Sequence, residues 1–140
     1  MKRILVAVDG SEPSMRAARM AADVALRFGA RITLAYVVPR LLLPPDVYGL
    51  TVAEVEREQR AHADTLVHQA LLQLGGTGVE VETSVLSGPP AESLAEAAQG
   101  PDVDLVVVGS RGIGAVKRML LGSVSDRLVH ICPKPILIVH

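Results

Sequence analysis

The chain has 140 residues and a formal net charge of −1. Hydrophobic residues make up 49% of the chain and aromatic residues only 2%. A chain of this length suits one domain, and the small net charge argues against a nucleic-acid partner. No apolar run approaches the ~18 residues of a membrane span, and the amino terminus turns polar too early for a signal peptide, so we expect a cytoplasmic protein with no membrane partner.

The amino-terminal part of the chain predicts two strands separated by a helix. Residues 3–8 form a continuous apolar run with β-branched residues, which is typical of a strand buried on both faces. Turn chemistry around Ser11 breaks this run and predicts the start of a helix that ends before Gly29. Residues 31–38 predict a second buried strand.

The middle of the chain predicts a loop, a helix and an edge strand. Residues 39–51 contain prolines and a glycine and predict a loop, while residues 52–74 predict a helix that ends at the glycines of residues 75–78. Residues 79–86 alternate apolar and polar side chains, the pattern of a strand with one face in water. We therefore place this strand at an edge of the sheet.

The carboxyl-terminal part predicts two further helix and strand pairs. Residues 91–99 and 123–131 predict short helices, and residues 105–108 and 135–139 predict strands. At the start of the last helix a serine and an aspartate three residues later have the spacing of a capping box.

The predicted element order over residues 1–140 is β-α-β-α-β-α-β-α-β. Crossovers of this length force parallel pairing with right-handed connections. We therefore predict an α/β fold, a single-domain, doubly wound, five-stranded parallel sheet of Rossmann-like type with helices on both faces. Ligands of such sheets bind beyond the carboxyl ends of the strands, where Asp9, Val37 and Gly109 fall.

The stretch between the fourth predicted strand and the last predicted helix has the composition of a phosphate-binding loop. Gly109 and Gly112 can take positive φ and admit a phosphate close to the backbone. Gly122 and Ser123 would put free N–H groups and a hydroxyl at a helix N-terminus, and Ser125 adds a second hydroxyl. These features predict an anion site.

Spacing alone leaves another interpretation of the same glycines open, namely a turn and a tight contact between helix and sheet. Two standard nucleotide fingerprints are excluded. No GxxxxGK[ST] is present, and Gly112-x-Gly114 is followed by Lys117 where a GxGxxG loop needs its third glycine. Arg111 and Lys117 supply cations near the loop.

Several stretches of the chain resemble the universal stress protein family. They are the opening ILVAVDGSEPS, the GPPAES turn, the spacing Gly109-x2-Gly112-x9-Gly122-Ser123 and the final Pro135-Ile-Leu-Ile-Val. The glycine spacing is similar to the ATP-binding signature of that family. The resemblance covers the whole chain and implies a universal stress protein-like domain over residues 1–140, with an adenine nucleotide alpha hydrolase-like fold.

The resemblance also implies a ligand, ATP with magnesium, and a function in stress response or signalling with slow or no ATP hydrolysis. Asp9 would lie near the ribose or the magnesium ion, Val37 would meet the adenine through its main chain, and residues 122–125 would hold the phosphates. Tyr36 departs from the family pattern, because many relatives have a histidine there. The implied nucleotide-binding residues are Ala7, Val8, Asp9, Val37, Val108, Gly109, Arg111, Gly112, Gly122, Ser123, Val124 and Ser125.

Two other functions remain open. The first is a nucleotide-independent dimeric interaction module of the same fold. The strand Ile136–Val139 can pair with the same strand of a second copy across a two-fold axis, which removes an exposed edge of the sheet. We therefore predict this homodimer with or without a nucleotide. The second is a dedicated enzyme, for which we find no general base and no GxSxG or HExxH motif, so we assign no catalytic residue.

Overall fold

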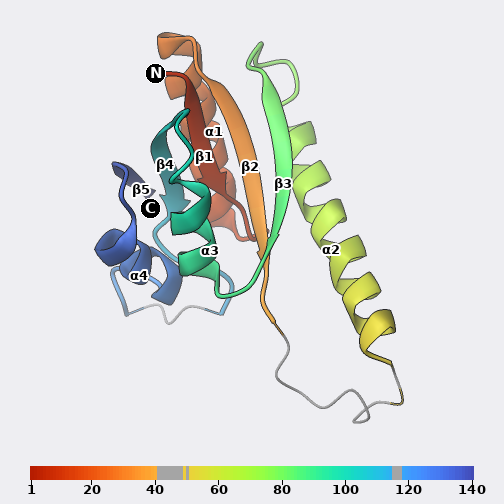
Figure 1. The fold of residues 1–140 in the computed structure, drawn as a ribbon. Helices are drawn as coiled ribbons and strands as arrows, with labels where there is room; N and C mark the ends of the chain where they lie inside the picture. The colour runs from red at the N-terminus through yellow and green to blue at the C-terminus, as the bar shows by residue number, and fades with distance from the viewer. Residues whose placement is uncertain (41–48, 50, 115–117) are drawn as a thin grey trace.

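The computed structural model describes residues 1–40, 49, 51–114 and 118–140. Most of the predicted loop over residues 39–51, and the Lys117 cation, lie outside these residues. Strands and helices alternate along the chain, as Figure 1 shows. They are β1 (Arg3–Ala7), α1 (Glu12–Phe28), β2 (Arg31–Val38), α2 (Val52–Gln73), β3 (Val81–Ser87), α3 (Pro90–Ala97), β4 (Val103–Gly109), α4 (Ser123–Ile131) and β5 (Ile136–Val139).

The five strands form one parallel sheet in the order β3-β2-β1-β4-β5. The predicted α/β fold is confirmed, and so is the edge position of β3. The chain adds β2 and β3 on one side of β1 and then β4 and β5 on the other. The strand order therefore reverses between β1 and β4, and their carboxyl ends form the switch point at which such sheets bind ligands.

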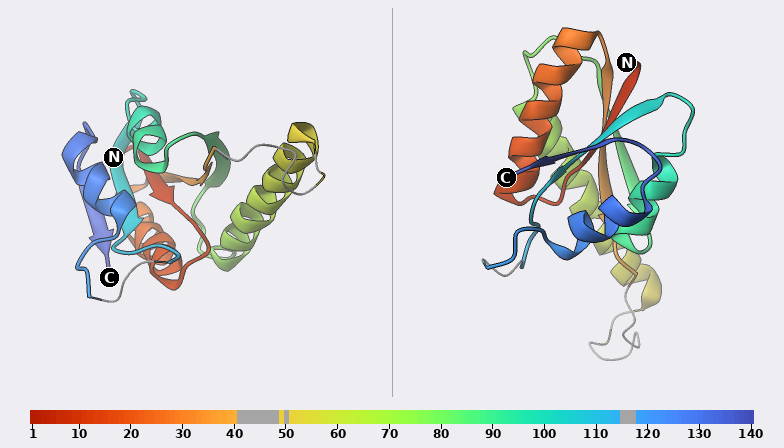
Figure 2. Two further views of the ribbon diagram at one scale, coloured as in Figure 1. Left: turned by 90° about the horizontal axis from the view of Figure 1, so that it is seen from below. Right: turned by 90° about the vertical axis from the view of Figure 1, so that its left-hand side faces the viewer.

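Helices cover both faces of the sheet, as predicted (Figures 1 and 2). On one face, Ile4 and Val6 of β1 pack in a buried cluster with α1 and α2. On the other face, Leu5 packs in a second cluster with α3 and α4. This alternation explains why the apolar run of β1 is uninterrupted, since both faces of the strand are buried.

Small side chains let α1 lie close to the sheet. Its buried face consists largely of alanines, namely Ala17, Ala18, Ala21, Ala22 and Ala25. Ser11 caps the helix by accepting a hydrogen bond from the N–H of Ser14, and Gly29 ends it with φ of 65°. The Ser11 cap lies in the loop that follows β1 and ties this loop to the first turn of the helix.

The predicted capping box at the start of α4 was wrong. Ser123 is the first helical residue and Gly122 is the N-cap. The N–H of Asp126, which a capping Ser123 would have to bind, bonds instead to the carbonyl of Gly122, and no side chain caps the helix. A capping box is present instead at α2. There Thr51 Oγ1 accepts from the N–H of Glu54 at 3.2 Å, and Glu54 Oε2 accepts from the N–H of Thr51 at 2.7 Å.

Across the described ranges, no helix combines the length and the apolar character that crossing a membrane requires.

Candidate functional site

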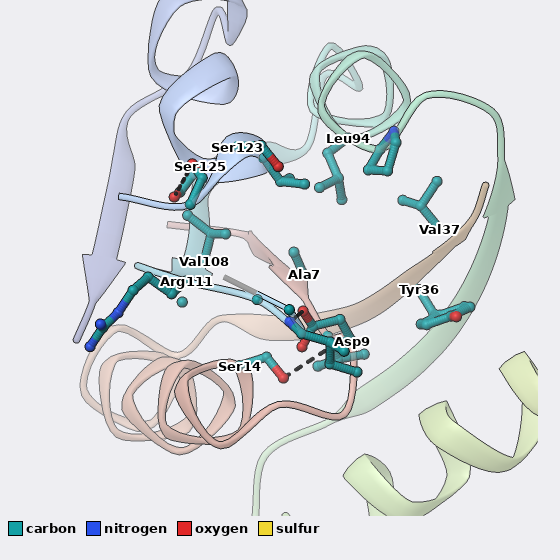
Figure 3. Close-up of a pocket in the computed structure, with 18 of the residues that line it drawn as sticks. Ala7, Asp9, Ser14, Tyr36, Val37, Leu94, Val108, Arg111, Ser123 and Ser125 are labelled. Atoms are coloured by element: carbon teal, nitrogen blue, oxygen red, sulfur yellow. Dashed lines mark hydrogen bonds between the residues drawn. The ribbon is translucent and has the colours of Figure 1, made fainter. Parts of the chain in front are cut away.

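A cavity of about 560 Å³ lies at the switch point. It is bounded by the carboxyl ends of β1, β2 and β4, the amino-terminal ends of α3 and α4, and the loop after β4 (Figure 3). Every residue for which the resemblance implies nucleotide binding, from Ala7 to Ser125, belongs to its lining. The fold thus brings together residues that are more than a hundred positions apart in the chain.

Asp9 connects two loops at the bottom of this cavity. Its Oδ1 accepts a hydrogen bond from the N–H of Ser11 at 2.9 Å, and its Oδ2 accepts one from the N–H of Ile113 at 3.2 Å. Ser14, which is buried, accepts the N–H of Asp9 at 3.3 Å and donates its hydroxyl to the carbonyl of Ser11 at 2.9 Å. The carboxylate is therefore held in place by backbone groups on both sides.

The signature glycines Gly109 and Gly112 are required for close packing. The expectation of positive φ was wrong for both, since neither is among the positive-φ glycines of the described residues. A Cβ on Gly109 would lie 2.8 Å from the backbone carbon of Pro13, and one on Gly112 would lie 2.5 Å from Oδ2 of Asp9. The alternative of a tight helix–sheet contact thus accounts for Gly109, and the Asp9 carboxylate accounts for Gly112.

At the start of α4, two of the expected anion donors are already engaged within the protein. The N–H of Gly122 bonds to the carbonyl of Ser110 at 2.6 Å, and the hydroxyl of Ser125 donates to the same carbonyl at 2.7 Å. The prediction that the Gly122 N–H is free was therefore wrong, and Ser125 is only 2% exposed. The Ser110 carbonyl instead fixes the first turn of the helix.

The helix start nevertheless presents donors to the cavity. The first bond of α4 is made by the N–H of Asp126, so the N–H groups of Ser123, Val124 and Ser125 have no carbonyl partner within the helix. The hydroxyl of Ser123, an exposed residue of the lining, adds a fourth donor. Figure 3 shows Arg111 with its side chain pointing away from the cavity, on the side where β5 lies.

The opposite part of the cavity is apolar apart from Tyr36. Its lining there comprises Ala35 and Val37 of β2 and Pro90 and Leu94 of α3. Burial, and to a smaller extent the negative charge of Asp9, raises the pKa of Tyr36 above its ordinary value of 10.0. The cavity therefore combines an apolar part with a part rich in hydrogen-bond donors.

The donor set for a metal ion is small. The described residues contain no group of three or more histidine, cysteine, aspartate or glutamate side chains that could hold a metal. Asp9 is the one carboxylate in the described lining, and two backbone N–H groups already bond to its oxygens. A metal ion would need most of its ligands from elsewhere.

Comparison with known proteins assigns the chain to a family, because the model of the family described as "Universal stress protein family" matches residues 1–140. The chain belongs to the universal stress protein family. It is 38% identical over 143 residues to the "Universal stress protein in QAH/OAS sulfhydrylase 3'region" of Thermus aquaticus, and the match covers 99% of this chain and 98% of that protein.

Solved structures of universal stress proteins share the fold. UspA from Lactobacillus plantarum superposes with a TM-score of 0.87 at 26% identity, and the match covers 99% of this chain and 97% of UspA. A second structure, of a universal stress protein in complex with cAMP, has a TM-score of 0.74 at 26% identity and covers 99% of this chain and 97% of that protein.

In this universal stress protein, sequence reasoning missed part of the lining. Pro90 and Leu94 reach the cavity from one face of α3 because they are four residues apart in a helix, and Ser14 reaches it from the first turn of α1. The apolar pair was hidden because core and cavity residues look alike in sequence. Ser14 could have been found from its place in the DGSEPS turn next to Asp9. In the structure it is one of the few buried polar residues.

Proposed function

We propose that this protein binds an adenine nucleotide, ATP in particular, in the cavity at the switch point, and that it acts as a nucleotide-dependent stress-response or signalling protein. The proposal rests on one observation: the glycines of the signature, Asp9 and Val37 all line the same cavity. A related solved structure is a complex with cAMP, an adenine nucleotide. The cavity volume falls within the range of small-molecule sites.

The phosphates are proposed to bind at the start of α4. The N–H groups of Ser123, Val124 and Ser125 and the Ser123 hydroxyl are donors at the positive end of the helix dipole. Gly122 contributes by its small size, since a Cβ there would lie 3.2 Å from Cα of Arg111. A larger residue at this position would push the loop after β4 away from the helix.

The base is proposed to occupy the apolar part of the cavity. Val37 at the end of β2 can offer its main chain to the adenine edge, and Pro90 and Leu94 supply the facing apolar wall. Ala7 and Val8, which precede Asp9, and Val108 and Gly109 at the end of β4 would border the ribose. This places the sugar between the two parts of the cavity.

Magnesium fits this site only as an ion bound together with the phosphates. Mg²⁺ commonly takes one or two protein carboxylates and completes its ligands with phosphate oxygens and water. Asp9 can supply that single carboxylate, because each of its oxygens accepts only one backbone N–H. When bound, the ion would neutralise part of the phosphate charge.

We propose slow ATP hydrolysis or none. In the described lining, Asp9 is the one acidic side chain, and histidine and lysine are missing from it. Hydrolysis needs an oriented water and stabilisation of charge in the transition state. Beyond Asp9, the described lining offers no carboxylate, histidine or lysine that could orient this water.

Isothermal titration calorimetry of the full chain with ATP, with and without Mg²⁺, tests the nucleotide proposal. We expect binding that weakens in Gly122→Val. Absence of binding at millimolar ATP would contradict the proposal and favour the nucleotide-independent interaction module. Mass spectrometry of small molecules released from the purified protein gives an independent test of which nucleotide is carried.

A homodimer through β5 is proposed for either function. The strand forms an edge of the sheet, pairs with β4 on its inner side only, and keeps all four of its side chains half-buried. Pairing with a second copy would satisfy its outer backbone groups. Light scattering at micromolar concentration should give twice the mass of the chain, and a monomer would refute the dimer.

A further inference from the structure

Helix α2 touches the cavity lining at Tyr36, and next to the lining it touches Gly10, which follows the lining residue Asp9. The ring of His62 meets the ring of Tyr36 edge to face, with centroids 6.4 Å apart and planes at 83°. Leu66, one turn later, packs on Gly10, where an added Cβ would lie 2.7 Å from its Cδ2. His62 and Leu66 share one face of the helix, and that face supports the ends of β1 and β2.

Tyr36 is the aromatic residue of the described lining. It lies at the carboxyl end of β2 on the side of the cavity next to α2, as Figure 3 shows. Its neighbour Val37 projects to the opposite face of the sheet, because successive side chains of a strand alternate. Tyr36 therefore brings an aromatic ring with a hydroxyl to the cavity from the α2 side of the sheet, whereas the aliphatic Val37 and Leu94 line it from the other side.

His62 is not needed for the core of the protein. The buried residues of α2 are Ala63, Val67 and Ala70, and no residue between Val52 and His62 is buried. His62 itself is exposed, so its ring can be removed without leaving a cavity in the core. The contact with Tyr36 is thus separable from folding.

We propose that Tyr36 contacts the base or ribose of the bound nucleotide and that His62 is a positioning residue that holds the Tyr36 ring in place. This inference rests on the proposed nucleotide site and extends it by a contact residue and a support from α2. An edge-to-face contact restricts the orientation of the Tyr36 ring. Without it, part of the binding free energy would go into ordering the ring.

The sequence offers a specific probe of this ring. The chain contains two tyrosines and no tryptophan, so Tyr48→Phe leaves Tyr36 as the sole source of tyrosine emission. In that background we expect AMP to change the emission of Tyr36. We expect His62→Ala to weaken AMP binding by about 2- to 12-fold, the equivalent of one aromatic pair.

Two further variants make the test specific. His62→Phe keeps a ring at this position and should restore AMP affinity to within about 2-fold of the starting protein. His68→Ala removes another exposed histidine of α2 and should leave affinity unchanged. Circular dichroism should show that each of these proteins is folded at the temperature of the binding measurements.

The outcomes separate this inference from the proposed function. Equal AMP affinity with and without His62, a loss that His62→Phe does not restore, or Tyr36 emission that ignores AMP while calorimetry detects binding would each overturn the inference alone. If calorimetry detects no AMP or ATP binding by the unmodified protein, the proposed function fails, and the inference falls with it.

Discussion

Asp9 Oδ2 accepts a hydrogen bond from the backbone N–H of Ile113 at 3.2 Å, which joins the end of β1 to the loop after β4. Gly112 permits this contact, because any side chain there would occupy the position of the carboxylate. The bond therefore joins Asp9 to a residue far away in the sequence, and it lies at the bottom of the proposed nucleotide site.

Replacing the Asp9 carboxylate should lower the stability of the fold. Asp9→Ala leaves the N–H groups of Ser11 and Ile113 without their acceptor, so we expect the free energy of unfolding to fall by about 1–3 kcal/mol. Urea unfolding measures this change. Asp23→Asn, at an exposed site on α1, is the control and should stay within about 0.5 kcal/mol of wild type. An Asp9→Ala protein as stable as wild type would contradict the role of Asp9 as a connector.

Two glycine substitutions should differ because their surroundings differ. A Cβ on Gly109 meets the backbone of Pro13 and Ser14 at 2.8 and 2.9 Å, whereas the atoms nearest a Cβ on Gly100 lie at 3.5 Å and beyond. We expect Gly109→Ala to destabilise the protein by about 1–3 kcal/mol, because backbone must move to admit the methyl group. Gly100→Ala should change stability little, and denaturant midpoints compare the two. Equal midpoints would show that the end of β4 is less tightly packed on α1 than described.

The two serines at the start of α4 should separate stability from binding. The hydroxyl of Ser125 is buried and bonded to the Ser110 carbonyl, so Ser125→Ala should cost about 1 kcal/mol of stability with little change in ATP affinity. The exposed Ser123 makes no cap bond, so Ser123→Ala should leave stability unchanged and weaken ATP binding by about 10-fold. Thermal denaturation and calorimetry on both variants check this, and the reverse pattern would place the phosphates elsewhere.

Tyr36 should make stability depend on pH in the alkaline range. The folded protein keeps the proton of Tyr36 to a higher pH than the unfolded chain does, because its pKa is raised above 10.0. The folded state then binds more protons than the unfolded state above pH 10, so the free energy of unfolding should decline as the pH rises past that value and should be unaffected below it. Urea unfolding between pH 8 and 11 should show a decline that is smaller in Tyr36→Phe. Parallel curves for the two proteins would exclude this effect.

Much of the fold follows from patterns within short segments. The uninterrupted apolar run of β1 reflects a strand that is buried on both faces, because the spacing of apolar residues follows burial. The glycines of the signature lie in the lining of one cavity. The signature did not reveal why Gly109 and Gly112 are glycines, because the atoms that exclude a side chain belong to Pro13 and Asp9, which are distant in sequence.

Other parts of the site depend on contacts that no local pattern encodes. The Ser110 carbonyl takes up the donors of Gly122 and Ser125, and this pairing appears only when the loop folds back on itself. The ring contact between Tyr36 and His62 likewise joins a strand to a helix across the loop between them. In each case a tertiary contact decides which polar groups remain available to a ligand.

The strand order has a consequence for synthesis of the chain. β1 is made first and lies in the middle of the sheet, but its neighbour β4 begins only at Val103. While the ribosome adds the intervening residues, one edge of this apolar strand has no partner, and such edges promote aggregation. The nascent chain is therefore most vulnerable before β4 emerges, when the start of α4, the proposed phosphate site, has not yet been made either.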